Sequence, residues 1–387
     1  MMKMKKIISM VSAAVIAASM SAVTAVPASA ANDTGWKSLY AKYLKQEAKK
    51  GAENKPNTYD VYFSLYDLDN DNTPELIESA DVKKIITYKN KKLYQIPLDD
   101  YVMDYGIAYE MFYSPSSKSF AMPFTGSSGR ISEYYSIHTL NNGIFEHSFD
   151  GIKWYYWENE SYECKIGEKE VNISEFDNAV KKNFHEDLIP LGSSFKANDT
   201  DIKCAVTGGK NYKTLYRDFL KGRIEKKYVQ YFRYADITGD NIPELFITDS
   251  LSKTCIYTYQ NGVLAYLGDI TPRFFETVPQ ASVGLDKTTN CICVNYKDES
   301  LEIYNFYRIT DKGITSEKLL SKYYVASKNS WTYNINRNPY SASIYYCVKE
   351  ISVNEYNSEL SKYTKMTFSP IGKKYKLTEK NIKNVIK

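Results

Sequence analysis

The sequence predicts an α+β protein made of two tandem copies of one unit. Each copy is expected to be a twisted antiparallel sheet with a strand–acidic loop–strand and flanking helices. The first reason is repetition, since YFSLYDLDNDNTPELIES returns about 170 residues later as YFRYADITGDNIPELFITDS. The second is that strand-like runs outnumber helical ones and do not alternate with long helices, which argues against a doubly wound parallel sheet.

Residues 1–30 are predicted to be a signal peptide. A basic start (MMKMKK) precedes an apolar stretch, and Ala28-Ser29-Ala30 has the small-x-small pattern of a cleavage site. We therefore expect a secreted, extracellular protein with no membrane span after signal cleavage. The remaining chain carries 47 basic and 46 acidic residues, a net charge of +1. This balance argues against nucleic acid and anionic membranes as partners.

The two copies are predicted to span residues 32–206 and 209–387. Each begins with an amphipathic helical segment, WKSLYAKYL from Trp36 in the first copy and YKTLYRDFL from Tyr212 in the second. After the acidic segment, each copy shows a hairpin pattern, IITYKNKKLY and CIYTYQNGVLAY. The second hairpin contains Asn-Gly, the strongest short-range signal for a tight β-turn.

The end of each copy is predicted to return to helix. EVNISEFDNAVKK, from Glu170, aligns with EISVNEYNSELSK, from Glu350, at an offset of 180 residues. Both segments place apolar or aromatic residues four apart on one helical face. Ser174 and Asn354 are predicted as the N-caps of these helices, because their side chains suit that position.

The repeated acidic loop predicts a structural calcium site in each copy. Calcium prefers six to eight oxygen ligands, which alternate side chains and backbone carbonyls of a coiled loop can supply. An acidic turn that is capped by its own side chains is the competing interpretation. The second loop has one acid fewer, so we expect weaker binding there. The predicted metal ligands are Asp67, Asp69, Asp71, Thr73 and Glu75 in the first loop, and Asp236, Thr238, Asp240, Ile242 (through its carbonyl) and Glu244 in the second.

These segments resemble a family of uncharacterised secreted proteins and lipoproteins of Gram-positive anaerobes that carry duplicated DxDxDGxxPEL segments, similar to the calcium loops of β-propeller and cell-surface repeat proteins. The matching residues are 66–76 and 235–245 for the loop, and 175–180 and 355–360 for the helix. The resemblance implies calcium loops between strands. This chain departs from the pattern by having Asn in place of Gly at the sixth loop position.

Aromatic residues supply the second candidate site. The chain has 36 Tyr, a residue that favours strands and keeps a polar tip on a large ring. Most of these rings are expected to pack on strand faces. The run Trp154-Tyr155-Tyr156-Trp157 is predicted as a platform for a sugar ligand, and an aromatic strand edge is the alternative.

The sequence favours a non-enzyme. It has only three His and lacks HExxH, GxSxG and a Gly-rich phosphate loop. The leading hypothesis is a secreted, non-catalytic binding or structural protein with Ca²⁺-stabilised loops, whose partner is a polysaccharide or a cell-surface protein. The alternative is an extracellular hydrolase, with glycosidase ahead of protease. A purely structural exported protein is the third possibility. The pairing of the six Cys and the oligomeric state stay open.

Overall fold

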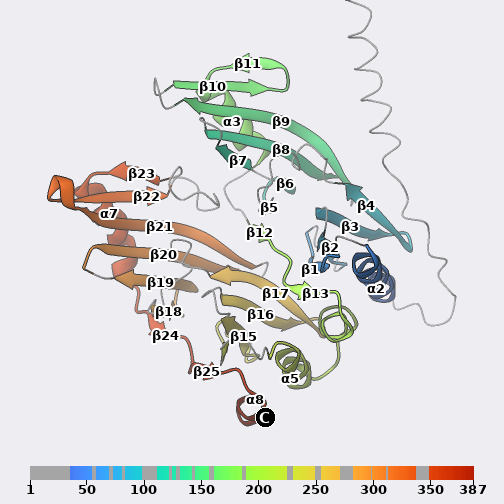
Figure 1. Ribbon diagram of the computed structural model, residues 1–387. Coiled ribbons are helices and arrows are strands. Elements are labelled where there is room, and N and C mark those ends of the chain that lie inside the picture. The colour runs from blue at the N-terminus through green and yellow to red at the C-terminus, as the bar shows by residue number, and fades with distance from the viewer. Residues whose placement is uncertain are drawn as a thin grey trace, which may run out of the picture.

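The computed structural model describes residues 35–387 with gaps at 55–57, 69–72, 81–82, 98–110, 122–123, 128–130, 142–143, 157–160, 185–188, 225–229, 249–253, 271–281, 298, 311–312 and 337–347. Its strands form four antiparallel sheets, two from each half of the chain, with helices packed against them (Figure 1).

One smaller, five-stranded sheet comes from each half, and the two have the same strand order. Each contains the strand–acidic loop–strand unit, the following hairpin and a two-residue strand contributed from much later in the chain. The first has the order β13 (Phe195–Lys196), β1 (Tyr62–Tyr66), β2 (Glu75–Ser79), β3 (Lys83–Lys89), β4 (Lys92–Pro97); the second has β25 (Tyr375–Lys376), β14 (Tyr231–Ala235), β15 (Glu244–Thr248), β16 (Thr254–Gln260), β17 (Val263–Ile270).

One larger sheet also comes from each half, again with matching order along its main path. The first has β12 (Ile189–Leu191), β5 (Met111–Ser114), β6 (Ser119–Ala121), β8 (Ile131–Asn141), β9 (Ile144–Tyr156), β10 (Ser161–Ile166), β11 (Lys169–Val171), with β7 (Phe124–Ser127) paired to β8; the second has β24 (Ser369–Pro370), β18 (Ser282–Asp286), β19 (Cys291–Lys297), β20 (Leu301–Thr310), β21 (Gly313–Val325), β22 (Ser330–Asn336), β23 (Val348–Ile351).

The helices pack against the sheets (Figure 1). Residue 172 caps one of them, since the Asn172 side chain accepts from the Glu175 N–H, and Ser352 does the same for Glu355 in the second half. The predicted caps, Ser174 and Asn354, lie two residues too late. The helices are α2 (Trp36–Glu53), α3 (Ile173–Asn183), α4 (Asp199–Ile202), the π-helix η2 (Lys203–Thr207), α5 (Tyr212–Gly222), the 3₁₀-helix η3 (Ala326–Lys328), α7 (Val353–Thr364) and α8 (Glu379–Val385).

The predicted α+β class with one sheet in each copy is wrong, because the described chain is mostly antiparallel β with two sheets in each half. After the hairpin β3–β4 the chain does not extend the first sheet but begins another. Strands β12 and β13 then return to the edges of both sheets, pairing with β5 and β1. The second half repeats this return with β24 and β25.

The two halves share a hydrophobic core. One cluster of buried side chains contains Tyr40 and Phe63 from the first half and Phe219 and Tyr257 from the second. Phe195 of β13 lies at this junction, with its ring centroid 5.5 Å from those of both Phe219 and Tyr257. Burial of a large aromatic ring stabilises a core by several kcal/mol, so this packing joins the first half to the second.

Among the described cysteines, Cys204, Cys291 and Cys293 are buried free thiols. Cys347 lies outside the described residues. Cys291 and Cys293 both lie in β19 and share one buried cluster, as expected for alternate residues of a strand. Within the described part of the chain, no helix combines the length and the apolar character that a bilayer crossing requires.

Candidate functional site

The second acidic loop joins two antiparallel strands, as the sequence predicts. It connects β14 to β15, with Ala235 opposite Glu244 at the base. The Asp236 carboxylate accepts from the N–H groups of Gly239 at 2.7 Å and Asn241 at 3.1 Å. Asn241 has φ 67°, a left-handed conformation that Asn tolerates better than most residues. The loop is thus coiled around the carboxylate at its first position.

The Glu at the ninth loop position closes the loop in both halves. Glu244 is fully buried, and its carboxylate accepts from the Ile237 N–H at 2.8 Å and from the Thr258 hydroxyl at 3.0 Å. Burial raises the pKa of Glu244, although these hydrogen bonds oppose that shift. In the first half, Glu75 is 2% exposed and accepts from the Leu68 N–H at 2.9 Å and from Thr87 at 3.3 Å. We call each of these arrangements a loop latch.

The structure places the predicted metal ligands unevenly. In the first loop, Asp69 and Asp71 lie outside the described residues. Asp67 and Thr73 are described, and they lie on either side of that gap. In the second loop, the Asp240 carboxylate accepts from the Ile242 N–H at 2.8 Å. Among the described residues, no group of three or more His, Cys, Asp or Glu is arranged to hold a metal ion. Glu75 and Glu244 accept hydrogen bonds that close their loops, a structural role that the sequence pattern did not predict.

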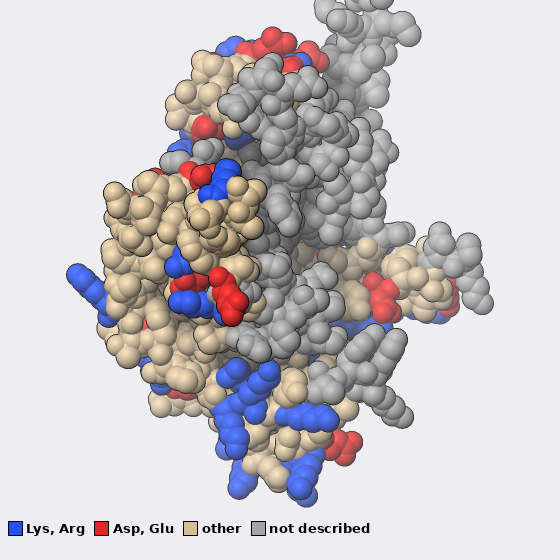
Figure 2. All heavy atoms as spheres, turned by 60° about the vertical axis from the view of Figure 1, so that its left-hand side comes forward, with Lys and Arg blue, Asp and Glu red and all other residues tan. Residues whose placement is uncertain are grey.

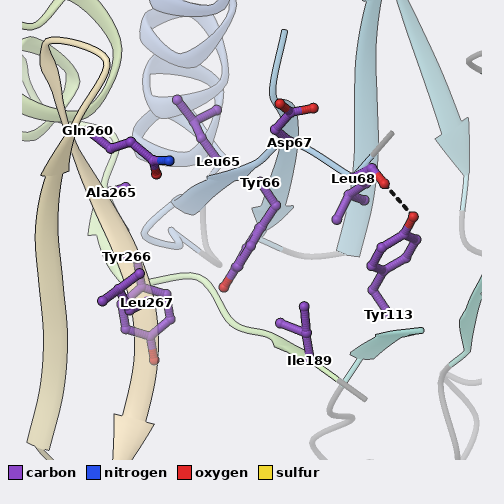
Figure 3. Close-up of a pocket in the computed structure, with 10 residues that line it drawn as sticks. All are labelled: Leu65, Tyr66, Asp67, Leu68, Tyr113, Ile189, Gln260, Ala265, Tyr266 and Leu267. Atoms are coloured by element: carbon purple, nitrogen blue, oxygen red, sulfur yellow. Dashed lines mark hydrogen bonds between the residues drawn. The ribbon is translucent and has the colours of Figure 1, made fainter. Parts of the chain in front are cut away.

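A small cavity lies where the first acidic loop meets the second half (Figure 3). It encloses about 120 Å³. The Tyr66 hydroxyl donates to the Gly192 carbonyl at 3.1 Å and accepts from the Gly192 N–H at 3.0 Å. Tyr113 donates to the Leu68 carbonyl. Both tyrosines therefore anchor the start of the loop. The lining residues are Leu65, Tyr66, Asp67, Leu68, Tyr113, Ile189, Gln260, Ala265, Tyr266 and Leu267.

Part of the predicted aromatic run lies in β9, where alternate residues of the strand face opposite sides of the sheet. Trp154 and Tyr156 share one face of the strand. On their face, Lys165 Nζ lies 5.5 Å from the Trp154 ring centroid, and the Tyr156 hydroxyl donates to Glu163 at 2.8 Å. Trp157 lies outside the described residues.

An aromatic cross-strand pair occurs at the same place in both large sheets. Tyr155 lies opposite Tyr162 in the β9–β10 hairpin, and Tyr324 lies opposite Trp331 in the β21–β22 hairpin. In each hairpin, one further residue pair separates this pair from the turn. Tyr162, Tyr324 and Trp331 are 44%, 39% and 36% exposed, which makes them among the most exposed large side chains described. The second pair was not predicted, because Tyr324 and Trp331 are seven residues apart in the chain and form no continuous aromatic run.

The surroundings of the second pair are polar and charged. The rings of Tyr324 and Trp331 lie 5.8 Å apart at a steep angle, and Lys322 Nζ lies 5.4 Å from the Trp331 centroid. Lys322 also pairs with Glu302 at 2.6 Å, which fixes its position. Lys153 holds the corresponding place in β9, where it pairs with Asp177 at 3.5 Å.

His138 lies buried in β8, with its ring stacked on Phe120 at 4.8 Å. Burial lowers its pKa to about 4, and nearby His147 acts in the same direction, while Asp150 opposes the shift. The Ser136 hydroxyl lies 3.4 Å from its Nε2. A neutral, stacked imidazole of this kind is a packing group.

We expect His138 to make the protein less stable in mild acid. The unfolded imidazole titrates near pH 6.5 and the folded one near pH 4, so the unfolded state binds more protons between these values. Stability from neutral His138 is complete above pH 6.5 and falls as the pH drops, by about 2–3 kcal/mol at pH 4.5. Urea unfolding at pH 7 and pH 4.5 measures this. The variant H138L should lose that part of the pH dependence, and an unchanged dependence would contradict the assignment.

No protein-family model matches this chain, and no curated protein matches it. Three solved structures share a low overall similarity. A Xanthomonas Type IV secretion system related protein has 9% identity and a TM-score of 0.23, covering 61% of this chain and 90% of its own. SapL1 lectin in complex with alpha methyl fucoside has 7% identity and a TM-score of 0.18, covering 71% and 92%. The fission yeast SREBP-SCAP binding domains have 6% identity and a TM-score of 0.18, covering 82% and 78%. Scores this low carry no argument about fold or function.

Proposed function

We propose that this chain is an exported, non-catalytic binding protein whose ligand is a polysaccharide of a cell surface or of the surroundings. The observation that carries the proposal is the presence of exposed aromatic side chains at the same register of two equivalent hairpins, Tyr162 in the first and Tyr324 with Trp331 in the second. Exposed aromatic rings pack against the C–H faces of sugar rings, and their polar tips donate to hydroxyl groups.

The comparison of the two halves supports a binding role over simple packing. The hairpin ends have diverged, since Tyr156 occupies the place of Val325 and Glu163 the place of Thr332. The aromatic pair nevertheless occurs in both. Two equivalent sites on one chain also allow a long polymer to be held at both ends, which raises the overall affinity well above that of one site.

Polysaccharide binding tests this proposal. The full chain without residues 1–30 is incubated with a panel of soluble and insoluble polysaccharides, and binding is measured by affinity electrophoresis and cosedimentation. We expect Y324A/W331A to bind its best polymer about tenfold more weakly, as for an interface anchor. The matched control is Y62A, which removes a ring that is 38% exposed on β1. Equal binding by both variants would overturn the proposal, and reducing-sugar release in the same tubes would favour the hydrolase alternative.

We also propose that calcium stabilises the acidic loops. The support is the recurrence of the pattern and the coiling of the second loop, whose alternate oxygens belong to Asp236, Thr238 and Asp240. A carboxylate oxygen that accepts one N–H keeps a second lone pair for a cation. The backbone carbonyl of Ile242 is the fourth proposed ligand, and the corresponding ligands of the first loop are Asp67, Asp69 and Asp71 with the Thr73 carbonyl.

Calcium is expected to raise the melting temperature relative to chelator. Free calcium at 100 times its dissociation constant adds about 2.7 kcal/mol to the free energy of unfolding. Differential scanning calorimetry measures the shift for the wild type and for D67A/D69A and D236A/D240A. Each variant should lose part of it, the first more than the second. An identical melt in calcium and chelator would leave both loops as acidic turns that need no metal.

A further inference from the structure

The whole chain is nearly neutral, but its last 17 residues are strongly basic. Residues 371–387 contain one acid, Glu379, and six lysines. All six lysines are exposed. Figure 2 shows blue side chains gathered at the lower end of the molecule, where Figure 1 places β25 and α8. We call this set the terminal lysine surface, and its members are Lys373, Lys374, Lys376, Lys380, Lys383 and Lys387.

This segment is anchored to the fold. Strand β25 pairs with β14, and Leu377, Ile382 and Ile386 are buried in the core that the two halves share. Arg233 of β14 donates to the Ile371 carbonyl at 3.0 Å. The lysines are therefore presented on a fixed strand–helix unit, which keeps their charges close together.

These charges are not neutralised within the described protein. None of the six lysines forms an ion pair with a described residue, although many lysines elsewhere do. Lys374 Nζ instead lies 4.2 Å from the ring centroid of Tyr231, and Lys373 Nζ lies 5.6 Å from that of Tyr375. A ring face attracts a cation but does not cancel its charge.

The corresponding segment of the first half is not basic. At the offset of 180 residues, Ser193 and Ser194 stand in place of Lys373 and Lys374. Its own lysines are paired, Lys196 with Asp60 at 2.7 Å and Lys203 with Asp218 at 2.7 Å. The same strand–helix unit therefore folds without the terminal lysine surface, and the fold does not require these charges.

We propose that the terminal lysine surface binds a flexible linear polyanion whose charges are phosphodiester groups. Lys is a compact point charge that suits phosphate without demanding a fixed geometry. Bound single-stranded nucleic acid needs free aromatic faces, but Lys373 and Lys374 cover the rings of Tyr375 and Tyr231. A bilayer surface is disfavoured because none of the exposed large apolar side chains described lies in residues 371–387. This proposal stands independently of the polysaccharide site.

Binding of poly(glycerol phosphate) to the full chain without residues 1–30 tests the inference. We expect affinity to fall about 300-fold between 50 and 200 mM salt for about six phosphate contacts, at a slope of about −0.7 per contact as for a single strand. The variant K373Q/K374Q/K376Q should reduce the slope of log affinity against log salt by roughly 2. The variant K380Q/K383Q, on α8, should reduce it by about 1–2 and guards against a folding defect near Tyr231. Far-UV circular dichroism confirms that each variant folds.

The matched control is K42Q/K287Q/K328Q, which removes three exposed lysines that form no ion pair with a described residue. This control should bind as the wild type does, since its lysines come from three separate elements. If the control and the surface variants weaken binding equally, the affinity depends only on the net charge of the protein, and the proposal is overturned. Tighter binding to single-stranded RNA or to anionic phosphatidylglycerol vesicles would overturn it as well. The variant Y324A/W331A should bind poly(glycerol phosphate) as the wild type does, even if it no longer binds polysaccharide.

Discussion

Replacing Lys84 with methionine is expected to lower the free energy of unfolding by about 3–5 kcal/mol, because the buried Glu78 carboxylate then loses the cation with which it pairs. Lys84 Nζ lies 3.0 Å from Glu78 and 3.2 Å from Glu47. The Glu78 side chain is fully buried, and burial raises its pKa. Burial also disfavours the Lys84 ammonium, but the two carboxylates outweigh this and hold its pKa above the ordinary value.

The second half shows what an apolar version of this site looks like. Glu78 pairs with Lys84 across β2 and β3, and at the equivalent register Ile247 pairs with Cys255 across β15 and β16. The charges are thus a property of the first half and not of the unit. Because a buried ion pair is often replaced by apolar residues at little cost, the double variant K84M/E78L should recover most of the stability lost by K84M.

Urea unfolding at pH 7 measures both effects. The matched control is K92M on neighbouring β4, where the lysine is exposed and forms no ion pair with a described residue. We expect K92M to change the free energy of unfolding by less than about 0.5 kcal/mol. A loss of under 1 kcal/mol for K84M, or no recovery in the double variant, would contradict the claim that the buried Glu78 carboxylate needs Lys84.

Local patterns predicted the local structure well. The Asn261-Gly262 turn joins β16 to β17 with φ of 52° and 81°, as expected for a tight hairpin turn. The predicted helix from Tyr212 is α5, which ends at Gly222. Both depend on residues within a few positions of each other, so a single sequence carries the information.

Nonlocal partners were not predictable in the same way. Strand β13 has only two residues, yet it pairs with β1, which lies more than 120 residues earlier. No periodicity shows in so short a segment, so the second sheet of each half and the shared core were missed. The metal-ligand pattern has the same limit, because it records that Glu244 is a carboxylate but not that the Ile237 N–H and the Thr258 hydroxyl already bond to it.

The loop latch is the second feature with a large expected effect. The variant E244M should lower the free energy of unfolding by about 2–4 kcal/mol. Its side chain has similar length but no acceptor, so the buried Ile237 N–H and Thr258 hydroxyl lose their partner, and each such loss costs about 1–3 kcal/mol. The variant T258V removes one donor and leaves the carboxylate bonded to Ile237, so it should cost only about 1 kcal/mol.

Amide hydrogen exchange separates the loss of the latch from a general loss of stability. In E244M the Ile237 amide should exchange faster than the overall drop in stability explains, while amides of β9, which contributes no residue to the buried cluster around Ile237, should follow the overall drop. Uniform acceleration would mean that Glu244 only supports the core. The latch and the proposed calcium site meet at Thr238, whose hydroxyl donates to Glu244 at 3.4 Å, while Asp236 coils the exposed tip of the loop. If both contribute, E244M should lose more stability in chelator than in calcium, since the cation then holds a loop whose own closure has been removed.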